Sequence, residues 1–259
     1  MIKLTEKELM RRVEAQREKD PFYRINALNY TGCTEKGEPY SEVLASWLYN
    51  MSEDDQKELL LQHSYMEESE KEKETERPIQ EERGEITFSE GSNRDEENIA
   101  KRMMQPGSSY VSNYDGTWVI DYQVPINRRG GSREGKADLI LVNDNKKVTI
   151  IGELKDMDSR ETLLRAMVEA RTYQIKVTEY SFVHDRFRRC YQYDTIRPAV
   201  LIFEGTQPWE DYLLMQNKDT SSLRDLASDW NMLIFKVKRS GQADVDIKNS
   251  IYEMGLVWS

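Results

Sequence analysis

Two apolar segments joined by a short polar turn constrain this chain more than any other feature. Residues 137–142 and 148–155 are rich in Ile, Leu and Val, and residues 143–146 are Asn, Asp, Asn and Lys, which favour tight turns. The pattern predicts a β-hairpin. Because the segments are apolar at odd and even positions alike, we expect the hairpin inside a sheet that is covered on both faces.

Three charged residues interrupt this hairpin. Asp138 lies on the first segment, and Glu153 and Lys155 lie on the second. Side chains at i and i+2 share a face of a strand, so Glu153 and Lys155 are expected to point the same way. If the turn centres on Asp144 and Asn145, Asp138 lies opposite Ile151 and shares that face. An odd-numbered register slip or a bulge would move Asp138 to the other face.

The chemistry of these three residues favours a metal site. Unpaired charge buried in central strands costs several kcal/mol unless a cation compensates for it. Two carboxylates at a strand end are ligands that Mg²⁺ or Mn²⁺ prefers. The lysine can stabilise charge that develops on a phosphate group, or can position or deprotonate an attacking water. The alternative is an exposed salt bridge on a strand, which the apolar residues around it disfavour.

An acid on one strand, a short connection and Glu-x-Lys on the next strand resemble the PD-(D/E)XK nuclease superfamily, which has the restriction-endonuclease-like fold. The resemblance covers about residues 93–240. It implies that Asp138 and Glu153 are the metal-binding catalytic acids, that the main-chain carbonyl of Leu154 is a further metal ligand, and that Lys155 is the catalytic lysine. Ala137 stands where the family has the proline that gives it its name.

A helix is predicted upstream, over residues 94–104, because acids fill its first turn and apolar residues follow at helical spacing. In the resembled family the first core helix often supplies a third acid, which implies Glu97, with Glu96 as the close alternative. Acids at this position also complement the helix dipole without any catalytic role. If the core begins earlier in the chain, Glu38 or Glu42 is the third acid instead.

A basic, glycine-rich loop is predicted between a strand over residues 117–126 and the strand that carries Asp138. A loop of this kind beside a metal site is suited to holding nucleic-acid phosphates, although the same residues also fit an ordinary solvated loop. The candidate nucleic-acid contacts are Arg128, Arg129, Arg133 and Lys136. Further basic clusters lie at residues 186–189 and 236–239.

Beyond Lys155, residues 156–159 are suited to capping a helix that runs from Arg160 to about Tyr180. This helix contains Glu169 and Tyr173, which resemble the Gln-x-x-x-Tyr element of exonuclease-like family branches with Glu in place of Gln. Helical spacing favours a surface glutamate and a core tyrosine here. The remaining predicted elements are a strand at 197–203, a helix at 223–230 and a last strand at 232–238. This order indicates an α/β protein with an α/β/α core and a mixed central sheet.

The front of the chain is different in composition. Residues 4–17, 40–50 and 52–61 predict three helices, whereas residues 67–85 are dominated by charged side chains that have nothing to bury. We therefore expect a helical N-terminal appendage, a charged linker or solvated helix, and a nuclease core, at residues 1–66, 67–91 and 92–259 respectively. The appendage is free to lie on the core, to form a homodimer or to bind another protein.

Charge and composition set outer limits. The net charge of −10 disfavours nucleic acid, but residues 1–100 carry 14 basic and 25 acidic side chains, which leaves the remainder at +1. No apolar run has the length of a membrane span and no apolar leader is present, so a cytoplasmic protein is expected. Cys33 and Cys190 lack the spacing of a zinc site. His63 and His184 lack it too, and His63 is the only upstream match to the metal-binding histidine of related cap-snatching viral endonucleases.

Together these features predict a Mg²⁺-dependent (or Mn²⁺-dependent) phosphodiesterase. DNA is favoured over RNA as the substrate, and the expected class is an endonuclease of bacterial or phage defence, restriction or repair. The rival hypothesis is a catalytically silent member of the same fold that binds DNA or protein. In the first case, Lys155→Ala should abolish cleavage without unfolding the protein. Sequence preference and endonuclease against exonuclease action are set by loops that one sequence does not define.

Overall fold

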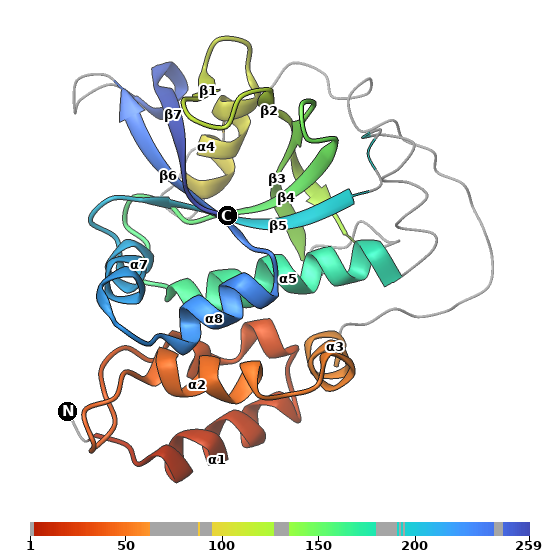
Figure 1. Cartoon of the computed structure of the whole chain (residues 1–259). Coiled ribbons are helices and arrows are strands. Elements are labelled where there is room, and N and C mark those ends of the chain that lie inside the picture. Colours follow the sequence, from red (N-terminus) through yellow and green to blue (C-terminus); the bar gives the residue numbers. More distant parts are fainter. Residues whose placement is uncertain are drawn as a thin grey trace.

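A seven-stranded mixed sheet forms the centre of the computed structural model, which describes residues 3–62, 88, 95–126, 135–179, 191, 193, 195–240 and 246–259 (Figure 1). The strand order is β1-β7-β6-β5-β4-β3-β2. The strands are β1 (Ser109–Val111), β2 (Thr117–Pro125), β3 (Lys136–Asn143), β4 (Val148–Leu154), β5 (Thr195–Phe203), β6 (Leu233–Ser240) and β7 (Ile251–Trp258). The α-helices of the described residues are α1 (Glu6–Arg17), α2 (Tyr40–Tyr49), α3 (Glu53–Leu61), α4 (Asp95–Met104), α5 (Leu163–Glu179), α7 (Gln207–Asn217) and α8 (Ser222–Asp229).

The predicted hairpin is formed by β3 and β4. Ile140 pairs with Ile151, so the register differs by two residues from the predicted one, and the turn centres on Asn145 and Lys146. A shift of two residues keeps every side chain on its predicted face. All of β4 is buried, and so is β3 beyond its first residue, Lys136, as expected for inner strands of a covered sheet.

The sheet is mixed because parallel pairs at its middle and at its β1 edge alternate with antiparallel pairs, and β1 runs parallel to β7. β5 runs parallel to β4 and β6, β3 is antiparallel to β2 and β4, and β7 is antiparallel to β6. β1 and β2 end the order but approach each other, so the sheet is curled. The prediction that residues 232–238 form the last strand is wrong, because β7 follows. Gly255 interrupts the apolar pattern of β7, and only Tyr252 and Met254 in it are buried.

Helices cover both faces of the sheet. α4 lies on one face and α5, with α7 and α8, on the other (Figure 1). The buried residues of α4 include Ile99 and Met103, as its predicted apolar stripe requires. α5 begins at Leu163 rather than at residue 160, and the Thr162 hydroxyl accepts the N–H of Arg165. Thr162 therefore caps the helix, and residues 155–162 form a loop beside the end of β4.

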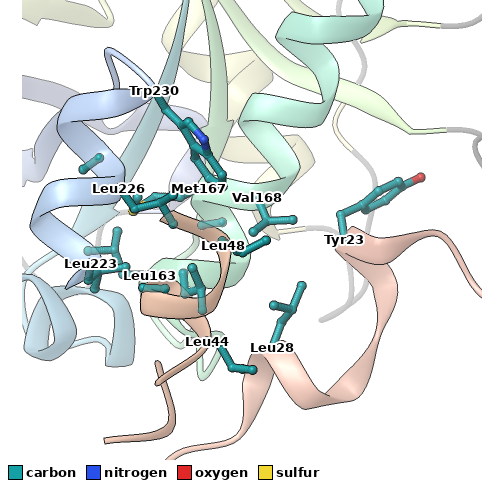
Figure 2. Close-up of a cluster of buried hydrophobic side chains, with 14 of the residues drawn as sticks. Tyr23, Leu28, Leu44, Leu48, Leu163, Met167, Val168, Leu223, Leu226 and Trp230 are labelled. Carbon is teal, nitrogen blue, oxygen red and sulfur yellow. The ribbon is translucent and has the colours of Figure 1, made fainter. Parts of the chain in front are cut away.

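The three N-terminal helices form a further layer, in which α2 packs on α8, α3 packs on α5, and α1 packs on α2 (Figure 1). Leu44 and Leu48 of α2 belong to the same buried cluster as Met167 of α5 and Trp230 after α8 (Figure 2). The Trp230 indole N–H also donates to Oε1 of Gln56 in α3 at 2.7 Å. Of the arrangements left open by the sequence, this structure contains the one in which the N-terminal helices lie on the sheet-and-helix core.

Most of the cysteine, histidine and linker residues named from the sequence are outside the described residues. Cys33 is a half-buried free thiol. Cys190, His63 and His184 are outside the described residues, as is the proposed charged linker apart from Phe88. No helix in the described part of the chain is both long enough and apolar enough to cross a membrane.

Candidate active site

The hairpin brings the three charged residues together at the end of β4. The Lys155 ammonium lies 2.8 Å from Oε1 of Glu153. The N–H of Leu154 donates to Oδ2 of Asp138 at 2.9 Å, which fixes the aspartate beside the same strand end. Asp138, Glu153 and Lys155 are 7%, 4% and 3% exposed, so all three are buried. The predicted convergence is therefore present in the structure, because the pleat and register place them on one face.

Two further carboxylates surround Lys155. Oε2 of Glu161, in the loop between β4 and α5, is 2.7 Å from its Nζ, and Oε2 of Glu169, on α5, is 3.5 Å away. The Tyr173 hydroxyl donates to Oε1 of Glu169 at 2.7 Å. The expectation that Glu169 is a surface residue is therefore wrong, since its side chain is 15% exposed and points at the lysine. Glu161 has no pattern in the sequence that marks it as a site residue.

The first core helix directs Glu96, not Glu97, toward this group. Oε1 of Glu97 pairs with Lys101 of the same helix at 2.6 Å. Oε1 of Glu96 instead accepts the N–H of Asp156, one residue after Lys155, at 3.4 Å. Burial raises the pKa of Glu96 to about 7; the charge of Lys155 lowers this pKa and the charge of Asp138 raises it. Glu96, the alternative to Glu97 in the sequence analysis, is thus the acid that the fold brings to the site.

The more distant acids do not reach the site. Glu42 is buried, and its carboxylate accepts the hydroxyl of Ser221 at 2.7 Å and the N–H of Leu223 at 3.2 Å. It therefore ties α2 to the start of α8, as a second capping group for that helix. Glu38 is exposed. Neither residue joins Asp138 and Glu153.

Most of the proposed basic loop is outside the described residues. Arg128, Arg129 and Arg133 lie outside the described residues. Lys136 is exposed at the start of β3, two residues before Asp138. It is therefore the one proposed phosphate contact that the described part of the chain locates near the acids.

The electrostatics show a shortage of positive charge. Burial raises the pKa of Asp138 to about 6, against the lowering effect of Lys155 and of two N–H donors. Burial, then Asp138 and Glu169, raise the pKa of Glu153 well above its usual value. Burial alone would lower the pKa of Lys155, but the surrounding carboxylates outweigh burial and raise it. One ammonium is thus shared among three buried or partly buried acids, and it stays protonated.

The donor set fits a divalent cation in its chemistry. Asp138 and Glu153 offer hard oxygen ligands, and the buried Oε2 of Glu153 accepts no hydrogen bond from an N–H or hydroxyl group of the described residues. The acidic surplus around it is the charge that a cation would balance. No group of three or more Asp, Glu, His or Cys side chains in the described ranges is arranged to hold a metal ion. An ion here would therefore rely on two carboxylates, water, substrate and the predicted Leu154 carbonyl.

A glycine and two tyrosines form one wall of the site. A Cβ on Gly135 would lie 2.3 Å from the hydroxyl of Tyr173, so only glycine fits there without a shift. The ring of Tyr23, from the N-terminal segment, meets that of Tyr173 edge-on at 5.8 Å between centroids. No pattern in the sequence singles out Gly135 or Tyr23, because their contact with Tyr173 depends on tertiary packing.

Residues 3–62 also support the loop that carries Glu161. The Thr162 hydroxyl donates to the carbonyl of Leu28, and the N–H of Thr162 donates to Oδ1 of Asn29 at 3.2 Å. The N-terminal layer therefore contacts both the loop and the tyrosine wall of the candidate site. No protein-family model, curated protein or solved structure matches this chain, so a function has to be proposed from these contacts alone.

Proposed function

We propose that this chain is a Mg²⁺- or Mn²⁺-dependent nuclease with the restriction-endonuclease-like fold. DNA is the favoured substrate, and the class is an endonuclease of bacterial or phage defence, restriction or repair. The observation that carries the proposal is the burial of Asp138, Glu153 and Lys155 together at the end of an inner strand. Burying charged groups in such a position is strongly unfavourable unless an opposite charge or a bound cation compensates for them.

Each residue has a defined task in this proposal. Asp138 and Glu153 would hold the cation, which when bound supplies Lewis-acid polarisation of a phosphate oxygen and a more acidic water. Lys155 is kept protonated by the carboxylates around it, so it acts as a fixed positive charge beside the reacting phosphate and not as the base. Glu96, at the first turn of α4, is the candidate for a third acid near the attacking water.

A second candidate function is supported by the same contacts. Lys155 is 3% exposed and is paired with Glu153, Glu161 and Glu169, so the charge of the lysine itself is satisfied within the chain. A catalytically silent member of the fold would retain such a network for structural reasons. This protein would then bind DNA or another protein without cleaving phosphodiester bonds.

A cleavage assay separates the two functions. Purified protein is incubated with supercoiled plasmid in Mg²⁺ or Mn²⁺, and nicked and linear products are measured. Glu153→Gln is the best inactivating variant, since Gln keeps the acceptor for Lys155 and places an amide where Oε2 accepts no N–H or hydroxyl group of the described residues. We expect the cleavage rate to fall by about tenfold to 100-fold or more. The control is Glu204→Gln, whose exposed side chain pairs with Lys236.

The outcomes are distinct. Cleavage by the wild-type protein and by Glu204→Gln, with loss in Glu153→Gln, supports the nuclease. No cleavage of DNA or RNA by the wild-type protein, together with no Mn²⁺ binding by calorimetry, supports the silent module. Cleavage that is equally strong in Glu153→Gln would show that the activity belongs to a contaminant or to another site.

A further inference from the structure

Gln123 has a backbone conformation that its place in a strand does not explain. Its φ is 48°, in the left-handed region that residues with a Cβ rarely adopt. Two other non-glycine residues in the described ranges have positive φ, and both have a local reason. Lys147 is in the β3–β4 turn and Asn231 follows the end of α8. Gln123 lies inside β2, where extended backbone is the rule.

The side chain of Gln123 reaches the candidate metal ligand. Tyr122 pairs with Leu139 and Val124 with Ala137, so Gln123 lies opposite Asp138 across the β2–β3 ladder. Its amide Nε2 donates to Oδ1 of Asp138 at 2.6 Å. A register shift in β2 between Val119 and Asp121, just upstream, marks a local irregularity of the kind that re-aims side chains.

Two neighbouring strands therefore fix the Asp138 carboxylate. Gln123 of β2 binds Oδ1, and the N–H of Leu154 in β4 binds Oδ2 at 2.9 Å. A carboxylate offers about four acceptor positions, so two donors leave room for further ligands on both oxygens. The orientation of the group is set before any ion binds.

The donor type matters as much as the contact. Both donors are neutral, so they hold the carboxylate in place and do not cancel its charge. An arginine or lysine at position 123 would form a salt bridge with Asp138 and compete with a cation for it. Of the two neutral side-chain amides, glutamine has the longer side chain. A strained backbone at a residue with a Cβ is typical of functional sites.

We propose that Gln123 is a positioning residue that holds the Asp138 carboxylate in the orientation required to bind a divalent cation. This inference rests on the proposed function, because it assigns the ion to the same site. Partners of metal ligands commonly change metal affinity by about tenfold to 100-fold when they are replaced. Gln123 acts through Asp138 and is assigned no contact with the substrate.

Mn²⁺ binding, measured by isothermal titration calorimetry, tests this inference without relying on activity. Gln123→Gly removes the amide and suits the left-handed backbone, so it weakens the contact without adding strain. Gln123→Asn tolerates the same backbone but has an amide one carbon too short. The matched control is Gln207→Ala, since Gln207 donates to Oδ1 of Asp211 at 2.8 Å, and Asp211 also accepts a main-chain N–H.

We expect about a tenfold or greater rise in the Mn²⁺ dissociation constant for both Gln123 variants and no change for Gln207→Ala. Circular dichroism and a denaturation midpoint check that each variant is folded. If Gln123→Gly does not fold, the affinity of Gln123→Asn decides the outcome. Wild-type binding with unchanged affinity in the folded Gln123 variants overturns this inference alone. Absence of Mn²⁺ binding to the wild-type protein overturns the inference and the metal-dependent function together. Mn²⁺ binding that needs Gln123 but supports no cleavage overturns only the nuclease.

Discussion

Replacing Lys155 with alanine should strongly destabilise the protein as well as inactivate it. Its ammonium is buried and lies 2.8 Å from Glu153, 2.7 Å from Glu161 and 3.5 Å from Glu169. Removing one partner of a buried ion pair typically costs about 3–5 kcal/mol, because the remaining charge has no compensation. For a urea slope of about 2.5 kcal/mol per M, the denaturation midpoint falls by roughly 1–2 M. This expectation replaces the fold-neutral Lys155→Ala that the sequence alone suggested.

The measurement is urea unfolding followed by tryptophan fluorescence in metal-free buffer. Lys57→Ala is the matched control, because Lys57 also contacts two carboxylates, Glu53 and Glu179, at 3.2 and 3.3 Å, but on the surface. Its loss should cost less than about 1 kcal/mol. Adding Glu153→Gln to Lys155→Ala should recover part of the lost stability, since it removes one uncompensated acid. Equal midpoints for the two single lysine variants would refute the idea that the buried acids depend on Lys155.

The tyrosine wall, the N-terminal layer and the proposed cation each allow one further test. Gly135→Ala should lower the free energy of unfolding by about 1–3 kcal/mol, because its Cβ would lie 2.3 Å from the Tyr173 hydroxyl. Thermal melting measures this loss, and an unchanged melting temperature would contradict the tight contact. Leu48→Ala, at a fully buried position, should lower the free energy of unfolding in urea by about 2–5 kcal/mol. A smaller loss would mean that the N-terminal layer packs loosely. Mg²⁺ at 100 times its dissociation constant should stabilise the wild-type protein by about 2.7 kcal/mol, and an equal gain in Glu153→Gln would place the ion elsewhere.

The hairpin and the shared face of its charges were predictable from sequence. The period of a strand is two residues, so Glu153 and Lys155 share a face in any register. Asp138 joined them because the actual register differs from the predicted one by an even number of residues. The continuous apolar runs also predicted burial on both faces, since an inner strand has no solvent side.

The residues that complete the site were not predictable in the same way. Glu96 and Glu97 are both acids in the first turn of α4, and only the packing of that helix decides which one faces Asp156. Glu161 approaches Lys155 from a loop that occupies the residues where the sequence suggested the first turn of a helix. Glu169 lies on α5 as predicted, and only the packing of that helix against β4 turns it toward Lys155. Contacts between elements distant in sequence leave no periodic signal in either segment.

The shared buried cluster of Figure 2 means that the front of this chain is a structural partner of the rest and not a detachable tail. A protease cut between residues 62 and 95 should leave two fragments that co-elute on size exclusion, held together by the buried cluster that contains Leu44, Leu48 and Met167. Expression of residues 95–259 alone would expose that apolar surface to water and favour aggregation. Any shortened version made for crystallography should therefore keep α1 to α3.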